Sequence, residues 1–313
     1  MSGRQPSGEA GASVVLTVAV IVILLAAASL TIVIGGNAAC GRPYNTFPPC
    51  ASTAARPSPP LNSTPLIIAP EDQDETTLGD LANSIGPYLI PRDTVMLSSG
   101  AGSNNSTADA SSLNNHQAEL APALPGGITF EARTSGLSNV RSVAAGLSAA
   151  FAGIIYDYEP DFEPEFTLDF ATTLGNFENF SKICHAAGFK AFGYPFSQPL
   201  WNPADQGYGW NYGQLYATTG VDDLQIQLQG AAKNPTTWSS SILELVSQYA
   251  AYGLPASDLS VQLTIAQGDP NNIPVSLAYE DYVYAVAHGV GSIVLWWDEE
   301  SLSDVLDFLG MIR

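Results

Sequence analysis

Short apolar runs alternate with longer amphipathic segments along most of the chain beyond residue 65. The runs are four to eight residues long, and most are followed by a stretch in which apolar residues recur at helical spacing. Strands that alternate with helices predict a parallel α/β sheet, and eight such units predict a closed (β/α)8, or TIM, barrel. The expected strands are Leu66–Ala69, Thr94–Ser98, Ile128–Ala132, Gly153–Tyr158, Ala191–Phe196, Leu224–Gln229, Leu259–Ala266 and Ser292–Trp297.

Residues 66–313 are therefore expected to form one barrel domain, since about 250 residues is a typical length for this fold. The long interruption between the second and third strands, Gly100–Gly127, is rich in Gly, Ser and Asn and predicts a surface insertion. A short helix is expected within it near Asn115–Leu120. The helices expected elsewhere are Thr77–Leu89, Asn139–Phe151, Leu168–Ala187, Ser239–Tyr252, Ala278–His288 and Ser301–Ile312.

The chain before the barrel divides into a tail at 1–12, an apolar segment at 13–35 and a Pro-rich stretch at 36–65. The apolar segment is free of charged residues and is long enough to cross a bilayer core of about 30 Å as a helix. A cleavable signal peptide is the alternative, but its apolar region is usually about 7–15 residues long. We therefore expect a retained membrane anchor that contacts the lipid bilayer, followed by a semi-rigid stalk.

The cysteines and the net charge indicate the compartment in which the barrel lies and a class of partner that it is not expected to bind. A disulfide between Cys40 and Cys50 would require an oxidising compartment, which favours an extracytoplasmic barrel, while Cys184 lies in an apolar pattern typical of a buried thiol. The net charge is −20, so a phosphate backbone would be repelled and nucleic acid is not an expected partner. The three histidines show no ligand spacing, and we expect neither a metal nor a cofactor.

The sixth expected strand, Leu224–Gln229, alternates aliphatic residues with three glutamines. Successive side chains of a strand point to opposite faces, so aliphatic residues toward the helices would place Gln225, Gln227 and Gln229 toward the barrel interior. Buried amides require hydrogen-bond partners, which could be one another, water or a polyhydroxylated ligand.

Two carboxylates end the fourth expected strand. Asp157 and Glu159 share one face, with Cα atoms about 6.6 Å apart if the strand is regular. In (β/α)8 enzymes the active site lies at this end of the strands, and repulsion between neighbouring carboxylates favours keeping a proton on one of them. Glu159, nearer the barrel mouth, is the expected proton donor. The alternative is a solvated acidic loop, because Glu163 and Glu165 follow at the same spacing.

This stretch resembles the fourth-strand motif of glycoside hydrolase family 18, the chitinase and endo-N-acetylglucosaminidase family. The motif is Asp-x-x-Asp-x-Asp-x-Glu, and this chain has Ala152, Ile155, Asp157 and Glu159 at its four acidic positions. The resemblance implies that Glu159 is the general acid. It also implies that Asp157 orients the acetamido group of the substrate, which serves as the internal nucleophile in this family. Ile155 departs from the motif.

Other positions extend the expected sugar site. Trp296 on the last strand is similar to the Trp that floors the reacting sugar in this family, and Gln227 is similar to a Gln found on its sixth strand. Glu131 on the third strand could face the pocket and assist. Aromatic rings suit the apolar faces of sugars, although ordinary packing would explain them equally well. The aromatic residues near the fifth strand are Tyr194, Trp201, Tyr208, Trp210 and Tyr212.

The expected function is that of a membrane-anchored, extracytoplasmic glycoside hydrolase. It would act on glycans containing N-acetylhexosamine, with retention of configuration and assistance from the substrate, so an oligosaccharide or polysaccharide is the expected partner. A non-catalytic glycan-binding barrel is the main alternative, because Ile155 stands where the family has an acid. A surface scaffold protein is a third possibility.

Overall fold

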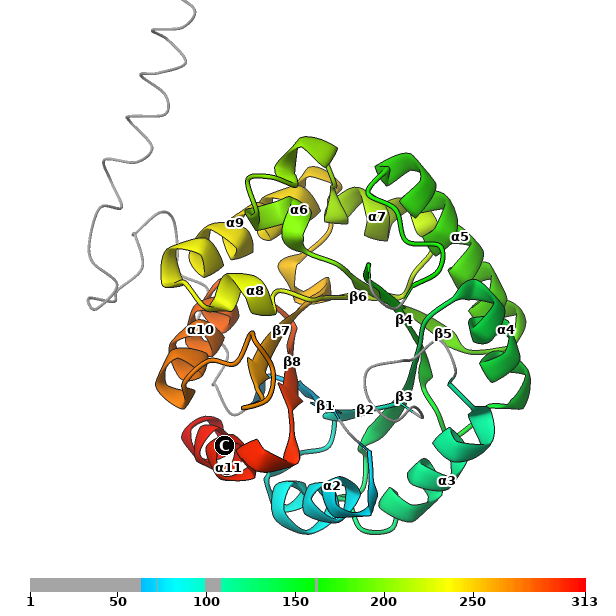
Figure 1. The fold of residues 1–313 in the computed structure, drawn as a ribbon, viewed down its shortest axis with the longest axis vertical. Coiled ribbons are helices and arrows are strands. Elements are labelled where there is room, and N and C mark those ends of the chain that lie inside the picture. The colour runs from blue at the N-terminus through cyan, green and yellow to red at the C-terminus, as the bar shows by residue number, and fades with distance from the viewer. Residues whose placement is uncertain (1–62, 72, 99–107, 161–162) are drawn as a thin grey trace, which may run out of the picture. The chain divides into compact units, whose positions relative to one another are not determined.

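The computed structural model describes residues 63–71, 73–98, 108–160 and 163–313. Within these ranges eight parallel strands close into a barrel in chain order, surrounded by helices (Figure 1). The predicted (β/α)8 barrel is thus confirmed. The strands are β1 (Leu66–Pro70), β2 (Thr94–Leu97), β3 (Thr129–Thr134), β4 (Gly153–Tyr158), β5 (Lys190–Pro195), β6 (Asp223–Ile226), β7 (Leu259–Ile265) and β8 (Ser292–Trp297).

The expected anchor at 13–35, the stalk at 36–65 and the Cys40–Cys50 pair lie outside the described residues, apart from the last three positions of the stalk. These expectations stay predictions. Among the helices that the structure does describe, none has both the length and the hydropathy needed to span a membrane.

The helices fill the connections between strands, and several begin at a side-chain cap. Asp109, Asp169 and Asn211 each accept a hydrogen bond from a backbone N–H in the first helical turn, which satisfies a donor that the helix itself leaves unpaired. The main helices are α2 (Glu75–Asp80), α3 (Ala110–Leu120), α4 (Leu137–Gly146), α5 (Phe170–Ala186), α6 (Gln198–Trp201), α7 (Tyr212–Thr219), α8 (Gln229–Ala232), α9 (Pro235–Ala251), α10 (Val275–Ala287) and α11 (Leu302–Ile312).

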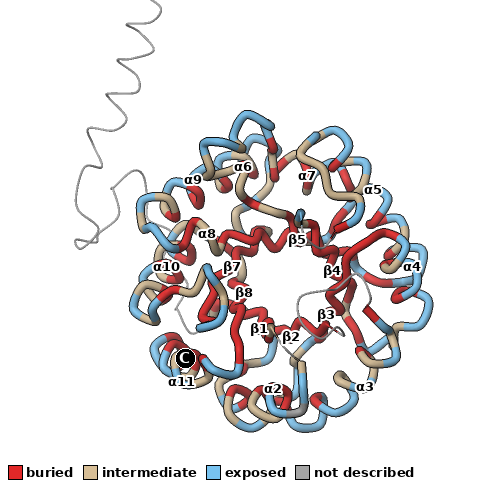
Figure 2. The backbone as a smooth tube through the Cα atoms, in the orientation of Figure 1, coloured by how far each residue is buried: buried red, intermediate tan, exposed pale blue. Residues whose placement is uncertain are grey.

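The strands carry apolar side chains on both faces. On the outer face these side chains pack against the helices, where the ring of Tyr156 lies 4.9 Å from that of Phe180 and 5.3 Å from that of Phe177, centroid to centroid. A second, separate cluster fills part of the barrel interior and includes Ile155 and Met96. Figure 2 shows the strands and the inner faces of the helices as the buried part of the chain. Ile155 thus has a packing role.

The sixth strand is shorter than the sequence predicts. β6 ends at Ile226, Gln227 forms an isolated bridge with Phe196, and Gln229 is the first residue of α8. The predicted strand is therefore too long at its end, and strand alternation does not determine where the side chain of Gln229 points. Gln225 and Gln227 do lie inside the barrel, as their contacts with Glu131 and Asp157 show.

Candidate active site

Asp157 lies at the centre of a buried hydrogen-bond network. Its side chain is fully buried, and its Oδ2 accepts hydrogen bonds from Arg133 on β3, from Nε at 3.1 Å and from Nη2 at 2.6 Å. Its Oδ1 accepts a hydrogen bond from Gln227 Nε2 at 3.0 Å, and this same nitrogen lies 2.8 Å from the carbonyl oxygen of Tyr194. The carboxylate is therefore fixed from two sides.

Glu159 lies one residue beyond β4, nearer to solvent. Its side chain is 19% exposed, and its Oε1 is 3.7 Å from Arg133 Nη2. Because Asp157 and Glu159 both pair with the same guanidinium, they lie on one side of the chain, as the alternation predicts. The positive charge of Arg133 thus links an enclosed acid with one that reaches the surface.

Two aromatic rings enclose the guanidinium of Arg133. Its Cζ lies 4.5 Å from the ring centroid of Trp296 on β8 and 5.5 Å from that of Tyr194 on β5, within the range of cation–π attraction. Tyr194 in turn donates a hydrogen bond to the amide of Gln262 on β7. Burial opposes the charged form of Arg133, but Asp157 outweighs it with help from Tyr194 and Glu159, and the pKa of Arg133 is raised.

The structure therefore brings together, around Arg133, most of the residues that the sequence identifies. They are Asp157, Glu159, Gln227, Tyr194 and Trp296. Arg133 itself is the residue that sequence reasoning missed. The predicted third strand ended at Ala132, whereas β3 continues to Thr134. The side chain of Arg133 points to the same face of β3 as that of Glu131, toward the barrel interior, but Arg133 lies two residues closer to the barrel mouth.

Glu131 is not part of this group. It contacts Gln225, whose Nε2 donates to Glu131 Oε2 at 2.8 Å, and it lines a pocket of about 310 Å³ with residues that begin strands, including Asp223 and Ser260. That pocket lies at the end of the barrel opposite the mouth, so the expectation that Glu131 assists Asp157 is not met. Burial raises the pKa of Glu131 to about 8 and that of Asp223 to about 7.

The acidic loop after β4 is not simply solvated. Glu163 is only 4% exposed, and its carboxylate accepts hydrogen bonds from the backbone N–H groups of Gly136 at 2.7 Å and Glu165 at 3.0 Å. Gly136 has φ +79°, a conformation that suits glycine, and directly precedes α4. Burial, followed by the hydrogen bond with Glu165, raises the pKa of Glu163 to about 8. The loop that follows Glu159 is thereby attached to the start of α4.

The aromatic residues beyond β5 contribute mostly to packing. Trp210 is 5% exposed and Tyr212 is fully buried, and their rings lie 6.0 Å apart, centroid to centroid, in the helix layer. Trp201 Nε1 donates a hydrogen bond to Ser197 Oγ at 3.2 Å, while Tyr208 is 47% exposed. For Trp210 and Tyr212 the packing interpretation holds.

The remaining metal-binding and nucleophilic side chains give no sign of a metal centre or a reactive thiol in the part of the chain that the structure describes. Within residues 63–71, 73–98, 108–160 and 163–313, no group of three or more His, Cys, Asp and Glu side chains is arranged to hold a metal ion. Cys184 is buried, as its pattern predicts, and burial raises the pKa of its thiol. A thiol that resists ionisation is a poor nucleophile.

Comparison with known proteins gives structural matches only. No protein-family model and no curated protein sequence matches the chain. A fungal endo-β-N-acetylglucosaminidase of glycoside hydrolase family 18 is 13% identical with a TM-score of 0.52, covering 80% of this chain and 99% of that one. The glycoside hydrolase domain of PgaB (BpsB) from Bordetella bronchiseptica is 10% identical with a TM-score of 0.53, covering 79% and 98%. The barrel has the fold of these glycoside hydrolases.

A third structure, a family 18 chitinase from Pseudoalteromonas aurantia, is 15% identical with a TM-score of 0.48 and covers 79% of this chain and 98% of that one. The likeness to the two structures with TM-scores of 0.52 and 0.53, at 13% and 10% identity, shows the fold alone. Function must be argued from the side chains at the barrel mouth.

Proposed function

We propose that this protein is a glycoside hydrolase that cleaves glycans containing N-acetylhexosamine. The observation that carries the proposal is the placement of Glu159 at the mouth of the barrel beside a buried Asp157 whose carboxylate accepts hydrogen bonds from Arg133 and Gln227. A proton donor must reach the glycosidic oxygen, and an orienting group must be held still. Glu159 has the required access to solvent, and Asp157 has the required fixation.

In the proposed reaction, Glu159 protonates the leaving glycosidic oxygen while the carbonyl oxygen of the substrate's acetamido group attacks the anomeric carbon. The bond to the leaving sugar breaks, and a cyclic intermediate forms on the substrate itself, as expected for the family that the sequence resembles. Asp157 orients the acetamido N–H. Glu159, now ionised, takes a proton from the water that opens the intermediate, and the original anomeric configuration is restored.

Arg133 answers the main objection to this scheme. The family has an acid at the position of Ile155 that would partner Asp157, but Ile155 here packs in the barrel interior. Arg133 supplies two donors to Asp157 instead, and Gln227 supplies a third. We therefore propose that Arg133 and Gln227 are positioning residues that hold Asp157 in place of the missing acid.

Glu159→Gln is expected to reduce hydrolysis of N-acetylglucosamine oligosaccharides or N-glycans by at least about 100-fold, a typical contribution of a general acid. Product release would be measured by chromatography. Glu299→Gln, which changes an exposed acid beyond β8, is the matched control and should retain wild-type turnover. Equal turnover by Glu159→Gln and wild type would rule out Glu159 as the acid.

A non-catalytic glycan-binding barrel is the second candidate, and one observation favours it. The guanidinium of Arg133 lies over the ring of Trp296, the surface on which the family resemblance would place the reacting sugar. Calorimetric binding of an oligosaccharide by the wild type, without any product after long incubation, would select this alternative.

The cellular location is proposed from the sequence alone. The apolar segment 13–35 would anchor the protein in a membrane, with the barrel on the extracytoplasmic side. Full-length protein is expected to sediment with membranes and to resist extraction at alkaline pH, whereas a variant without residues 1–35 should remain in the supernatant. Full-length protein in the supernatant would contradict the anchor.

A further inference from the structure

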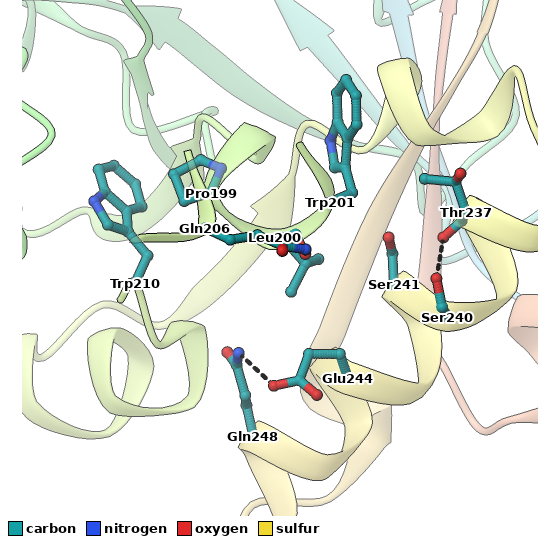
Figure 3. Close-up of a pocket in the computed structure, with 10 residues that line it drawn as sticks. All are labelled: Pro199, Leu200, Trp201, Gln206, Trp210, Thr237, Ser240, Ser241, Glu244 and Gln248. Carbon is teal, nitrogen blue, oxygen red and sulfur yellow. Dashed lines mark hydrogen bonds between the residues drawn. The ribbon is translucent and has the colours of Figure 1, made fainter. Parts of the chain in front are cut away.

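A second pocket, of about 440 Å³, lies between the segment that follows β5 and helix α9 (Figure 3). One wall comes from residues 199–210 and is largely apolar. The opposite wall comes from α9 and is polar. The lining residues are Pro199, Leu200, Trp201, Gln206, Trp210, Thr237, Ser240, Ser241, Glu244 and Gln248.

The polar wall follows from the spacing of residues on α9. Thr237, Ser241, Glu244 and Gln248 are separated by four, three and four positions, which places them on one face of a helix. Gln248 Nε2 donates to Glu244 Oε1 at 3.1 Å, and its Oε1 accepts a hydrogen bond from the backbone N–H of Tyr212 at 2.8 Å. These contacts hold Glu244 and Gln248, at the C-terminal end of this wall, in place.

Ser241 is the residue that most directly indicates ligand binding. It is only 2% exposed, and its Oγ has no hydrogen-bond partner in the described part of the chain. The hydroxyl points away from α9, on the side of the helix where Trp201 lies (Figure 3). Leaving a buried hydroxyl unpaired is unfavourable, whereas a ligand that enters the pocket could supply the missing partner.

The apolar wall is aliphatic at its centre. The rings of Trp201 and Trp210 point away from the middle of the pocket, while the side chain of Leu200 points into it (Figure 3). Trp201 packs so closely over Gly230 that a Cβ atom there would lie 2.5 Å from Trp201 Cζ2. An aliphatic wall that faces hydroxyl, carboxylate and amide groups matches a sugar ring, which combines an apolar face with a rim of hydroxyls.

A chain of contacts connects this pocket with the candidate active site. Trp201 donates to Ser197 Oγ, and Ser197 donates in turn to the carbonyl oxygen of Gln227. The side chain of Gln227 donates to Asp157. Gln227 therefore contacts the pocket wall through its carbonyl oxygen, by way of Ser197, and contacts Asp157 through its side chain.

We infer that this pocket is a saccharide-binding site separate from the barrel mouth, and that it holds another unit of the glycan proposed as substrate. The choice of a sugar as occupant rests on the proposed function. The volume of about 440 Å³ falls within the range of roughly 300–1,000 Å³ common for small-ligand pockets.

The test is calorimetric titration of a β-linked N-acetylglucosamine tetrasaccharide into the Glu159→Gln protein, in which turnover is suppressed. Two binding events are expected. Adding Ser241→Ala should weaken one of them by about 2- to 10-fold, the effect of losing one hydrogen bond. Without ligand, the same substitution should raise Tm slightly, because it removes an unpaired buried hydroxyl. Ser241→Leu, which fills the floor of the pocket, should abolish that binding event.

Ser239→Ala is the matched control, because Ser239 lies on the same helix but its Oγ already donates to the carbonyl oxygen of Thr236. It should leave both binding events unchanged. Titrations that are identical with and without the Ser241 substitutions, or no binding in any variant, would overturn the inference. Binding that depends on Ser241 in a protein that cleaves nothing would support the pocket and contradict the hydrolase. Cleavage by the wild type, together with binding that does not depend on Ser241, would support the hydrolase and contradict the pocket.

Discussion

Arg133→Met is expected to lower the free energy of unfolding by about 3–5 kcal/mol, the usual effect of removing one partner from a buried ion pair. Asp157 is fully buried and would lose both donors on Oδ2. A buried carboxylate without its cation is strongly disfavoured, so the native state would weaken although the shape of the methionine stem is similar. Urea unfolding of the barrel domain would measure the change.

Lys182→Met provides the comparison, because Lys182 pairs with Glu178 at the same N–O distance of 2.6 Å but with side chains that are 68% and 54% exposed. We expect its effect to be below about 1 kcal/mol. The double variant Arg133→Met with Asp157→Asn should recover part of the lost stability, since the fully buried side chain at position 157 is then uncharged. Equal losses for Arg133→Met and Lys182→Met would show that the ion pair has little structural importance.

Glu131→Gln is expected to change how stability depends on pH. The pKa of Glu131 is raised to about 8 in the folded protein, so between its unfolded and folded values the folded state binds more protons. The resulting stabilisation is complete below the unfolded value of about 4.3 and is lost as pH rises toward 8, by an amount on the order of a few kcal/mol. Glutamine resembles the protonated acid and can still accept the hydrogen bond from Gln225.

The variant should therefore unfold at nearly the wild-type temperature at pH 5 and at a higher temperature than wild type at pH 9. In the variant the unfolding temperature should still decline with rising pH, but less than in wild type, because the pKa values of Asp223 and Glu163 are also raised. Glu280→Gln, an exposed substitution of the same type on α10, should follow the wild-type curve. Parallel curves for wild type and Glu131→Gln across this pH range would contradict the assignment.

The fold was predictable because its determinants are local. An apolar run and the helical spacing after it are readable within a dozen residues, and β4 and β8 begin and end where the sequence predicts. Asp157 and Glu159 were found for the same reason, since two acids on one strand face need only the alternation of side chains. The sequence predicts too long a sixth strand because the alternation in Leu224–Gln229 continues past Ile226, where β6 ends, to the first residue of α8.

The remainder of the site depends on contacts across the barrel. Arg133 reaches Asp157 only through the pairing of β3 with β4, and Gln227, one residue beyond β6, reaches it across 70 residues of sequence. A solvated loop is the alternative that the local sequence offers for Glu163, because nothing near it in the chain shows that the backbone of Gly136 will meet it. Such pairings are set by strand register and barrel closure, which no local pattern specifies.

The most direct test of the central claim is time-resolved proton NMR of a β-linked N-acetylglucosamine oligosaccharide incubated with wild type and with Glu159→Gln. Substrate-assisted hydrolysis with Glu159 as the acid predicts that the first product released by wild type is the β-anomer, which then equilibrates, and that the variant releases essentially none. An α-anomer as first product, or equal release by both proteins, would contradict it.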